Sequence, residues 1–396
     1  MEEEEKMSNA RVYYVPSTNL MGRGCLKELP ALVKELGQKK ALVVTDKFLN
    51  QSGLAGKVLA ELDTINLEYV IFDDVKPNPT VQNVYEGVEV FKENACDFIV
   101  SIGGGSPQDA AKAIGLYVTN GGDLRDYEGV GKTKNKSVPI VAINTTAGTS
   151  SEFTINYVIT DTDREVKMVM VDKNSLVTIS VNDPELMVDK PADLTAATGV
   201  DALTHAIEAI VTPGAFPVTD ATALAAVEII FNYLPRAVKD GHDIEAREQM
   251  TYVMFLAGIA FNNAGLGFVH AMAHQLGGVY DLPHGVCNAM LLPIVERENA
   301  KRDPKKFRLI AKAAGIQVEG KTDEQCADEV IEAIKALCKE VGIPSTLSEL
   351  GVTDVDLDKL ATNALADACA PGNPFQPTKE EVIEMFKEIA SPVVLR

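Results

Sequence analysis

Three of the five histidines in this 396-residue chain lie in one short window, and a fourth lies upstream. The window GFVHAMAHQLGGVYDLPHG contains His270, His274 and His284, and His205 follows Asp201 by four residues. Two side chains four residues apart on a helix project from the same face and can bind one ion. Neutral imidazoles and a carboxylate are typical ligands of divalent transition metals. The spacing therefore predicts a metal site.

Four histidines lie in these segments, whereas one ion needs only three of them together with the aspartate. We favour Asp201, His205, His270 and His284, because one ligand from a helix and one from the Pro-Gly turn at His284 give wide angles. His274 then becomes a nearby proton carrier, although spacing alone leaves this choice open. The donor types suit Fe(II), Zn(II), Co(II) or Mn(II), and the absence of paired cysteines argues against a structural zinc site. A single Asp/His pair is more often a surface hydrogen bond, but two pairs in surroundings poor in charge favour the metal.

A glycine-rich turn follows a β-branched apolar run in FIVSIGGGSPQDAAK. The run Phe98–Ile102 predicts a buried parallel strand. Ser106 is expected to be the N-cap of the next helix, with Pro107 at its first position. Glycines at such a turn allow backbone N–H groups to approach a phosphate closely. The glycines concerned are Gly103, Gly104 and Gly105.

A second turn of this kind follows the predicted strand Val138–Ile143 and is rich in hydroxyl groups. Two such loops at strand ends are what a dinucleotide crevice requires. Ordinary capping of two helices remains the alternative explanation. The hydroxyl-bearing residues are Thr145, Thr146, Thr149, Ser150 and Ser151.

An acidic residue, Asp46, ends the predicted strand Ala41–Thr45. Its carboxylate could accept hydrogen bonds from a ribose 2′-hydroxyl and would repel a 2′-phosphate, which favours NAD over NADP. This acid precedes the glycines instead of following them, so a standard Rossmann half is not expected. Taken alone, an aspartate in this position is usually a helix cap.

The overall composition narrows the class of protein. The formal net charge of −20 and a pI of about 4.7 argue against binding to nucleic acid or to an anionic membrane. The chain shows neither a signal-peptide pattern nor a run of eighteen apolar residues. Its six cysteines form no paired motif and are expected to be reduced thiols. We therefore expect a cytoplasmic protein.

The character of the chain changes near residue 190, which predicts two domains. Residues 1–190 are expected to form an α/β domain with a parallel sheet flanked by helices, and residues 191–396 an all-helical domain. A smaller antiparallel excursion is expected from Thr154 through the segment LVTISVNDPELM. The histidines and the glycine loops fall in different domains, so the active site is expected in the cleft between them. Further strands are expected at Arg11–Val15, Lys40–Thr45 and Glu68–Phe72, and helices at Thr80–Asn94, Ala192–Val211, Phe216–Val238, Ile244–Asn263 and between Glu324 and Ile389.

Four motifs of the chain resemble those of the iron-containing (group III) alcohol dehydrogenase family. GGGSPQDAAK, TTAGTSSE, GVDALTHAIE and GFVHAMAHQLGG…LPHGVCNAMLLP are close to the family's most recognisable stretches, and the resemblance runs through nearly the whole chain. It implies a dehydroquinate synthase-like architecture, NAD as cofactor, and iron, or zinc as in some relatives. The implied metal ligands are Asp201, His205, His270 and His284. His274 would lie close to the nicotinamide.

The resemblance also implies further contact residues. Phe261 and Cys369 would line the substrate pocket. The residues implied to contact the cofactor are Asp46, Asn78, Gly103, Gly104, Gly105, Ser106, Thr145, Thr146, Thr149, Lys167 and Leu186.

The reaction expected is hydride transfer between NAD(H) and a short-chain aliphatic alcohol or diol, with the metal acting as a Lewis acid on the alcohol oxygen. Candidates are 1,2- or 1,3-propanediol, ethanol and butanol. The alternatives are a zinc-dependent glycerol dehydrogenase and, less favoured, a dehydroquinate synthase-like lyase. A homo-oligomer, from dimer to decamer, is expected, with the N-terminal strand as an edge that pairs between subunits.

Overall fold

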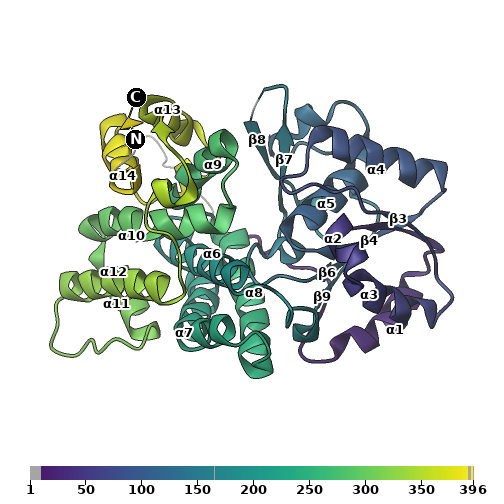
Figure 1. The fold of residues 1–396 in the computed structure, drawn as a ribbon, viewed down its shortest axis with the longest axis horizontal. Coiled ribbons are helices and arrows are strands. Elements are labelled where there is room, and N and C mark those ends of the chain that lie inside the picture. The colour runs from purple at the N-terminus through teal and green to yellow at the C-terminus, as the bar shows by residue number, and fades with distance from the viewer. Residues whose placement is uncertain (1–9, 165, 391–393, 396) are drawn as a thin grey trace, which may run out of the picture.

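A single parallel sheet forms the centre of the first half of the protein in the computed structural model, which describes residues 10–164, 166–390 and 394–395 (Figure 1). The strand order is β1-β9-β6-β4-β2-β3, and every neighbouring pair is parallel. The four inner strands are apolar runs that are almost fully buried on both faces, as parallel sheets require, whereas the edge strands β1 and β3 are partly exposed. Their bounds are β1 (Thr18–Met21), β2 (Lys40–Val44), β3 (Glu68–Phe72), β4 (Phe98–Gly103), β6 (Ile140–Asn144) and β9 (Ile179–Asn182).

Helices cover both faces of this sheet. Ala41 and Val43 of β2 face one side and pack in a cluster with residues of α1 (Leu29–Leu36) and α3 (Leu54–Asp63). Leu42 and Val44 face the other side, where α4 (Val81–Glu93) and α5 (Gly105–Asn120) lie. The alternation of side chains along a strand explains this division. The short helix α2 (Lys47–Gln51) follows β2 directly.

A small second sheet has the order β5-β8-β7 and adjoins α5. Its antiparallel pair, β7 (Asn156–Asp161) and β8 (Val166–Val171), lies within the predicted antiparallel excursion. The short strand β5 (Gly129–Val130) joins β8 in parallel. The prediction is wrong for the segment that forms β9, which inserts between β1 and β6 of the main sheet. All four β9 residues are buried, and a strand in this position satisfies its backbone on both sides.

The expected strand at Arg11–Val15 is also wrong, since the first strand begins at Thr18. The backbone N–H of Tyr14 donates to Oδ1 of Asn263 at 2.6 Å, and its carbonyl accepts from the amides of Asn262 and Asn263. The side chains of Asn262 and Asn263 therefore satisfy the backbone groups of Tyr14 that a neighbouring strand would otherwise pair with.

The second half of the protein is built almost entirely from helices. The long helix α6 (Ala192–Val211) lies at its centre and packs against α7, α8 and α10. Sixteen of its twenty residues are buried, which explains why its sequence lacks a clear polar face. The other helices are α7 (Pro217–Lys239), α8 (Ile244–Ala264), α9 (Phe268–Tyr280), α10 (His284–Arg302), α11 (Pro304–Ala313), α12 (Asp323–Glu340), α13 (Leu357–Ala366) and α14 (Lys379–Ala390).

The second half of the protein also contains a short pair of strands and a strongly apolar helix. Strands β10 (Asp354–Val355) and β11 (Val394–Leu395) form a two-stranded parallel pair, which an all-helical prediction did not include. Helix α7 is long and apolar enough to cross a membrane by composition, as is the bent pair α8 and α9 taken together. Helix α7 nevertheless packs its buried side chains against α6 and α8. The predicted fold class, a helix-flanked parallel sheet followed by helices, is confirmed, and the boundary at residue 190 stays a prediction.

Candidate metal and cofactor site

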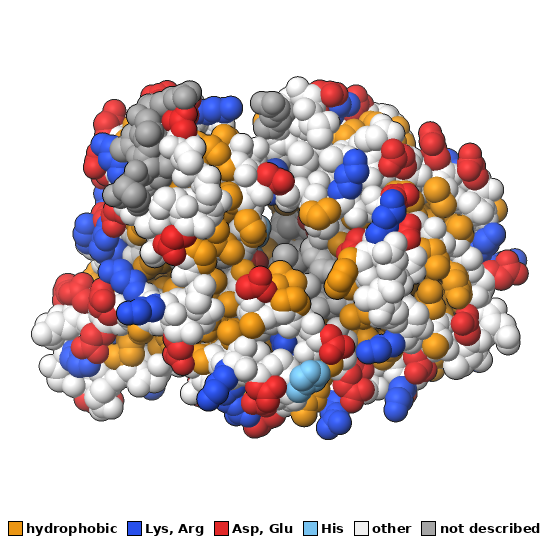
Figure 2. All heavy atoms as spheres, in the orientation of Figure 1, with side chains coloured by type: hydrophobic (Ala, Val, Ile, Leu, Met, Phe, Trp, Pro, Cys, Tyr) orange, Lys and Arg blue, Asp and Glu red, His pale blue; other side chains and the backbone are white. Residues whose placement is uncertain are grey.

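A cavity of about 350 Å3 lies between the sheet half and the helical half of the protein. Figure 2 shows a notch between the two halves on the face drawn there. Seven of the residues that line the cavity from the sheet half are Asn78, Gly105, Ser106, Asp109, Thr149, Ser151 and Lys167. Six of those that line it from the helical half are His205, Phe261, His270, His274, His284 and Cys369.

Three of the predicted ligands converge beside this cavity, where His270 and His284 line the wall. Nε2 of His284 lies 3.6 Å from Oδ1 of Asp201, and Nε2 of His270 lies 3.9 Å from the same oxygen. One ligand atom from each of these residues lies within 4.8 Å of the other two. A divalent ion with bonds of about 2.0–2.2 Å to nitrogen and oxygen fits a triangle of this size. Helices α6, α9 and α10 each contribute one of the three side chains.

The fourth predicted ligand, His205, lies beside this group but not within it. Its ring stacks on that of His270 with centroids 4.7 Å apart, and Phe261 covers its other face at 4.3 Å. His205 and Asp201 lie on the same face of α6, one turn apart, as the spacing predicts. The structure therefore places His205 next to Asp201 and His270 without bringing its ligand atom into the convergent set.

Burial determines the charge state of the cluster. It lowers the pKa of His205, and it holds the pKa of His270 and of His284 well below the usual range. Burial alone would raise the pKa of Asp201, but the neighbouring His205, His284 and His270 outweigh it and lower that pKa. Neutral imidazoles around an ionised carboxylate have the lone pairs and the charge that a divalent cation needs. This donor set fits Fe(II) or Zn(II).

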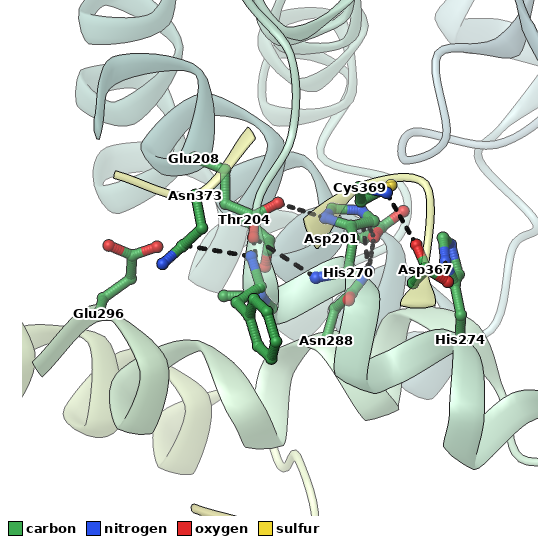
Figure 3. A network of polar contacts seen from close by, with 12 residues as sticks. Asp201, Thr204, Glu208, His270, His274, Asn288, Glu296, Asp367, Cys369 and Asn373 are labelled. Carbon is green, nitrogen blue, oxygen red and sulfur yellow. Dashed lines mark hydrogen bonds and ion pairs between the residues drawn. The ribbon is translucent and has the colours of Figure 1, made fainter. Parts of the chain in front are cut away.

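A buried glutamate orients His270. Oε2 of Glu208 lies 2.6 Å from Nδ1 of His270, and its Oε1 accepts a hydrogen bond from the backbone N–H of Val269 at 2.8 Å (Figure 3). Glu208 follows Asp201 by seven residues and lies on the same face of α6. A carboxylate on one ring nitrogen fixes the tautomer and leaves the lone pair of the other nitrogen available to a metal. Burial raises the pKa of Glu208 to about 7.

The structure corrects the position of His284. We expected this histidine in a loop, but it is the first residue of α10. Asn288 consequently lies one turn further along the same face, where its Nδ2 is 2.7 Å from Oδ1 of Asp201, 3.0 Å from Nε2 of His284 and 3.2 Å from Nε2 of His270. Asn288 thus contacts all three convergent ligand atoms.

The remaining histidine of the window, His274, belongs to a neighbouring group. Its Nδ1 lies 3.0 Å from Oδ2 of Asp367, the residue that follows α13, and Cys369 lies beside them (Figure 3). The rings of His274 and His284 stack with centroids 5.5 Å apart. His274 therefore borders the convergent group and lines the same cavity. His242, the fifth histidine of the chain, is exposed and lies outside both groups.

The two predicted phosphate-binding loops pack against each other. A Cβ at Gly104 would lie 2.8 Å from Cγ2 of Thr146, and one at Gly105 would lie 3.0 Å from Cγ2 of Thr149. A larger residue at either position would therefore push the threonine side chain of the second loop aside. Helix α5 begins at Gly105 with Gly104 as its N-cap, so the predicted N-cap role of Ser106 is wrong. Ser106 lies in the first turn and lines the cavity.

Several predicted cofactor residues lie outside the cavity wall. Asp46 caps α2 by accepting a hydrogen bond from the N–H of Leu49 at 2.8 Å. Leu186 packs in the apolar cluster on the α1 and α3 face of the sheet. The other predicted cofactor residues that do not line the cavity are Gly103, Gly104, Thr145 and Thr146, which form the loops behind it.

A polar bridge of hydrogen bonds starts at two residues of the cavity wall, Asn78 and Lys167, and reaches the helical half. Nζ of Lys167 donates to Oδ1 of Asn78 at 2.8 Å, and Nδ2 of Asn78 donates to Oδ1 of Asp281 at 2.9 Å. Asn78 and Lys167 belong to the sheet half, and Asp281 is the residue that follows α9. Asn78 and Asp281 both have positive φ angles, 55° and 53°, which is uncommon for residues other than glycine. Two predicted cofactor residues are thus joined to the helical half.

Four residues near the site were not predicted from the sequence: Glu208, Asn288, Asp367 and Asp281. Glu208 could have been found, because it continues the seven-residue face of α6 that begins at Asp201. Asn288 could have been found only if His284 had been placed on a helix. No signal in the sequence connects Asp367 or Asp281 with the site, because both reach it through the packing of distant segments.

Comparisons with known proteins identify the family of the chain. Residues 16–184 match the family described as iron-containing alcohol dehydrogenase, and residues 195–390 match the C-terminal part of the Fe-containing alcohol dehydrogenase family. The NAD-dependent methanol dehydrogenase of Bacillus methanolicus is 48% identical over 95% of this chain and 98% of its own. The lactaldehyde reductase of Escherichia coli K12 is 46% identical over 93% and 97%. The crystal structure of a 1,3-propanediol oxidoreductase superimposes with a TM-score of 0.94 at 47% identity, over 96% of this chain and 100% of that chain. The chain therefore belongs to the iron-containing alcohol dehydrogenase family and is an oxidoreductase.

Proposed function

We propose that this protein is a metal-dependent, NAD-linked dehydrogenase of short-chain aliphatic alcohols or diols, and the reductase of the corresponding aldehydes. The observation that carries the proposal is the convergence of Asp201, His270 and His284 beside a cavity that is also lined by residues of the glycine- and hydroxyl-rich loops. The names of the relatives from Bacillus methanolicus and Escherichia coli point to the same chemistry. The proposed substrates are C1 to C4 alcohols and diols.

The residues that would hold the metal are Asp201, His205, His270 and His284, with iron favoured and zinc possible. When bound, the metal supplies Lewis acidity toward an alcohol or carbonyl oxygen, and NAD supplies the hydride acceptor. Glu208 fixes the ring of His270, and Phe261 packs against His205. These contacts keep the imidazoles of α6 and α9 in place while the substrate enters.

The cofactor would bind along the carboxyl ends of β4 and β6. Gly103, Gly104, Gly105 and Ser106 provide a close backbone approach at the start of α5, where the helix N-terminus favours phosphate. Thr145, Thr146 and Thr149 add hydroxyl groups from the facing loop. Asn78, Lys167, Asp46 and Leu186 would provide the remaining contacts.

His274 would carry the proton released from the alcohol. It lines the cavity beside His284, and Asp367 orients its ring through Nδ1. Phe261 and Cys369 would form the apolar wall around the substrate carbon atoms, which suits a short aliphatic chain better than a charged sugar. A zinc-dependent glycerol dehydrogenase is the second candidate, because the same donor set fits zinc.

We also propose that the protein acts in the cytoplasm as a homo-oligomer and that it binds neither membrane nor nucleic acid. All six cysteines are free in the structure, which fits a reducing compartment. Acidic side chains are scattered among basic ones on the face shown in Figure 2.

An NADH-linked screen of C1 to C4 alcohols, diols and glycerol with anaerobically prepared protein tests the proposed reaction. The protein should form NADH with at least one short alcohol, and a chelator should abolish the activity. Activity that survives complete removal of the metal would overturn the proposal. Preference for glycerol with bound zinc would support the second candidate.

A further inference from the structure

A second group of potential metal ligands lies beside the predicted metal site. One ligand atom each of His274, Asp367 and Cys369 lies within 4.8 Å of the other two. This group shares no residue with Asp201, His270 and His284. The side chains of His274 and Asp367 are 9% and 8% exposed, and all three residues lie near or at the wall of the cavity.

The group combines three donor types that bind soft and borderline cations. A thiolate, an imidazole and a carboxylate together prefer Zn(II) or Cd(II), whereas a set of nitrogen and oxygen donors also accepts Fe(II). Cys369 is the one sulfur-containing side chain among the residues that line the cavity. The two neighbouring groups therefore differ in the class of metal they prefer.

The protein holds these donors in place from two directions. Asp367 accepts hydrogen bonds from the backbone N–H of Cys369 at 2.9 Å and from Nε2 of Gln275 at 3.2 Å. His274 and Gln275 are adjacent residues of α9, so Asp367 ties that helix to the segment that follows α13. Burial holds the pKa of the Cys369 thiol well above its usual range, and the neighbouring Asp367 and Glu208 raise it further, so the thiol gives up its proton only to a bound cation, which the charge of Asp367 attracts.

We propose that His274, Asp367 and Cys369 form a second, thiophilic metal site, and that Zn(II) or Cd(II) bound there inhibits the enzyme. The ion would displace the thiol proton to solvent and bind the sulfur, an imidazole nitrogen and a carboxylate oxygen. Occupation would take His274 away from proton transfer and place a hydrated ion against the apolar wall formed by Phe261 and Cys369. The inhibition rests on the proposed function, whereas the binding of metal does not.

Titration of the metal-loaded holoenzyme with CdCl2 tests this proposal. Absorbance of the Cd–thiolate charge-transfer band in the ultraviolet, NADH formation and resident metal content are followed together. The wild type should gain the band with one added equivalent and lose activity in parallel while it retains the resident metal. Cys369→Ser should lack the band. Loss of an outer-shell partner of a metal weakens binding by roughly 10–100-fold, so loss of the sulfur ligand should raise the half-inhibitory Cd(II) concentration at least about tenfold.

Cys25→Ser is the matched control, because Cys25 is also partly buried but lies in the sheet half. It should behave like the wild type, and Asp367→Asn should weaken the band without removing the sulfur. Equal inhibition of wild type and Cys369→Ser, or inhibition that follows release of the resident metal, would overturn the proposal. If the holoenzyme forms no NADH with any alcohol, the proposed function fails, and the band alone still decides whether the second site exists.

Discussion

At the scale of single residues, the histidines of one window have different surroundings although they have the same type. His270 and His284 point their Nε2 atoms at Asp201, whereas His274 turns its Nδ1 toward Asp367. Spacing predicted that these residues meet, and the side-chain contacts suggest how the roles divide. We assign His284 to the metal and His274 to proton transfer.

Substitution of these two histidines separates the roles. His284→Ala should lose the metal, because a convergent ligand is removed. His274→Ala should retain it and slow turnover by about 100- to 10,000-fold, the usual contribution of a positioned acid or base. Metal analysis and steady-state rates of both variants provide the measurement. A metal-free His274→Ala protein would make His274 a ligand.

The buried carboxylate of Glu208 leads to a second prediction. The backbone N–H of Val269 and Nδ1–H of His270 each donate a hydrogen bond to one carboxylate oxygen of Glu208. In Glu208→Gln, the NH2 group of the amide must replace one of these oxygens, so one of the two donors loses its acceptor. The variant should therefore bind metal about 10–100-fold more weakly. Competition with a chromophoric chelator measures the affinity, and the exposed Glu228→Gln serves as control. Unchanged metal affinity would show that Glu208 has only a packing role.

At the scale of elements, helix α10 carries a buried acid, Glu296, three turns after the predicted metal ligand His284. Glu296 is fully buried, and its Oε1 has no hydrogen-bond partner among the described residues. Burial, together with the neighbouring Glu208, raises the pKa of Glu296 to about 8. Its one described side-chain contact is with Nδ2 of Asn299 at 3.2 Å. The folded protein therefore holds this residue in its protonated form at neutral pH.

The raised pKa predicts how stability depends on pH. The unfolded chain loses this proton near pH 4.3, whereas the folded protein loses it near pH 8, so the stabilisation is complete at low pH and disappears as the pH rises through about 8. Glu296→Gln cannot ionise, so its Tm should fall less than that of the wild type from about pH 6 to about pH 9. Thermal unfolding at several pH values measures this difference. Parallel Tm profiles would contradict the assignment.

The positions of several strands could be predicted from the sequence, but their neighbours in the sheet could not. The apolar runs that became β2 and β4 were located well, because a buried parallel strand reads as a continuous hydrophobic segment. The destination of β9 was missed, because an apolar run does not specify which strands it pairs with. The start of α10 was missed because Pro283 suggested a turn, whereas proline also precedes helices readily.

At the scale of the whole molecule, the site exists only because the two halves face each other. The predicted metal ligands come from α6, α9 and α10, and the glycine- and hydroxyl-rich loops come from the ends of β4 and β6 (Figure 1). The sequence predicted that the motifs lie on separate parts of the chain and would meet in a cleft. It could not predict the bridge from Lys167 through Asn78 to Asp281, since residues 203 positions apart in sequence meet there.

This bridge should control the release of the cofactor. Asp281→Ala removes the acceptor of the Asn78 hydrogen bond, and a bond of this kind contributes about 0.5–1.5 kcal/mol, so NADH should dissociate roughly 2- to 10-fold faster. Asp281→Asn retains an acceptor oxygen and tolerates the positive φ, so it should resemble the wild type. Stopped-flow displacement of NADH measures the rates. Identical rates in all three proteins would exclude a role of the bridge.

The central claim is that one metal ion, held by the Asp201 and histidine cluster, makes this protein an NAD-linked alcohol dehydrogenase. Stepwise addition of Fe(II) to anaerobic metal-free protein, with NADH formation from a short alcohol as the readout, tests it most directly. We predict that activity rises linearly and saturates at one equivalent per chain, and that Asp201→Ala shows no such rise. Full activity of the metal-free protein, or equal activation of Asp201→Ala, would contradict the account.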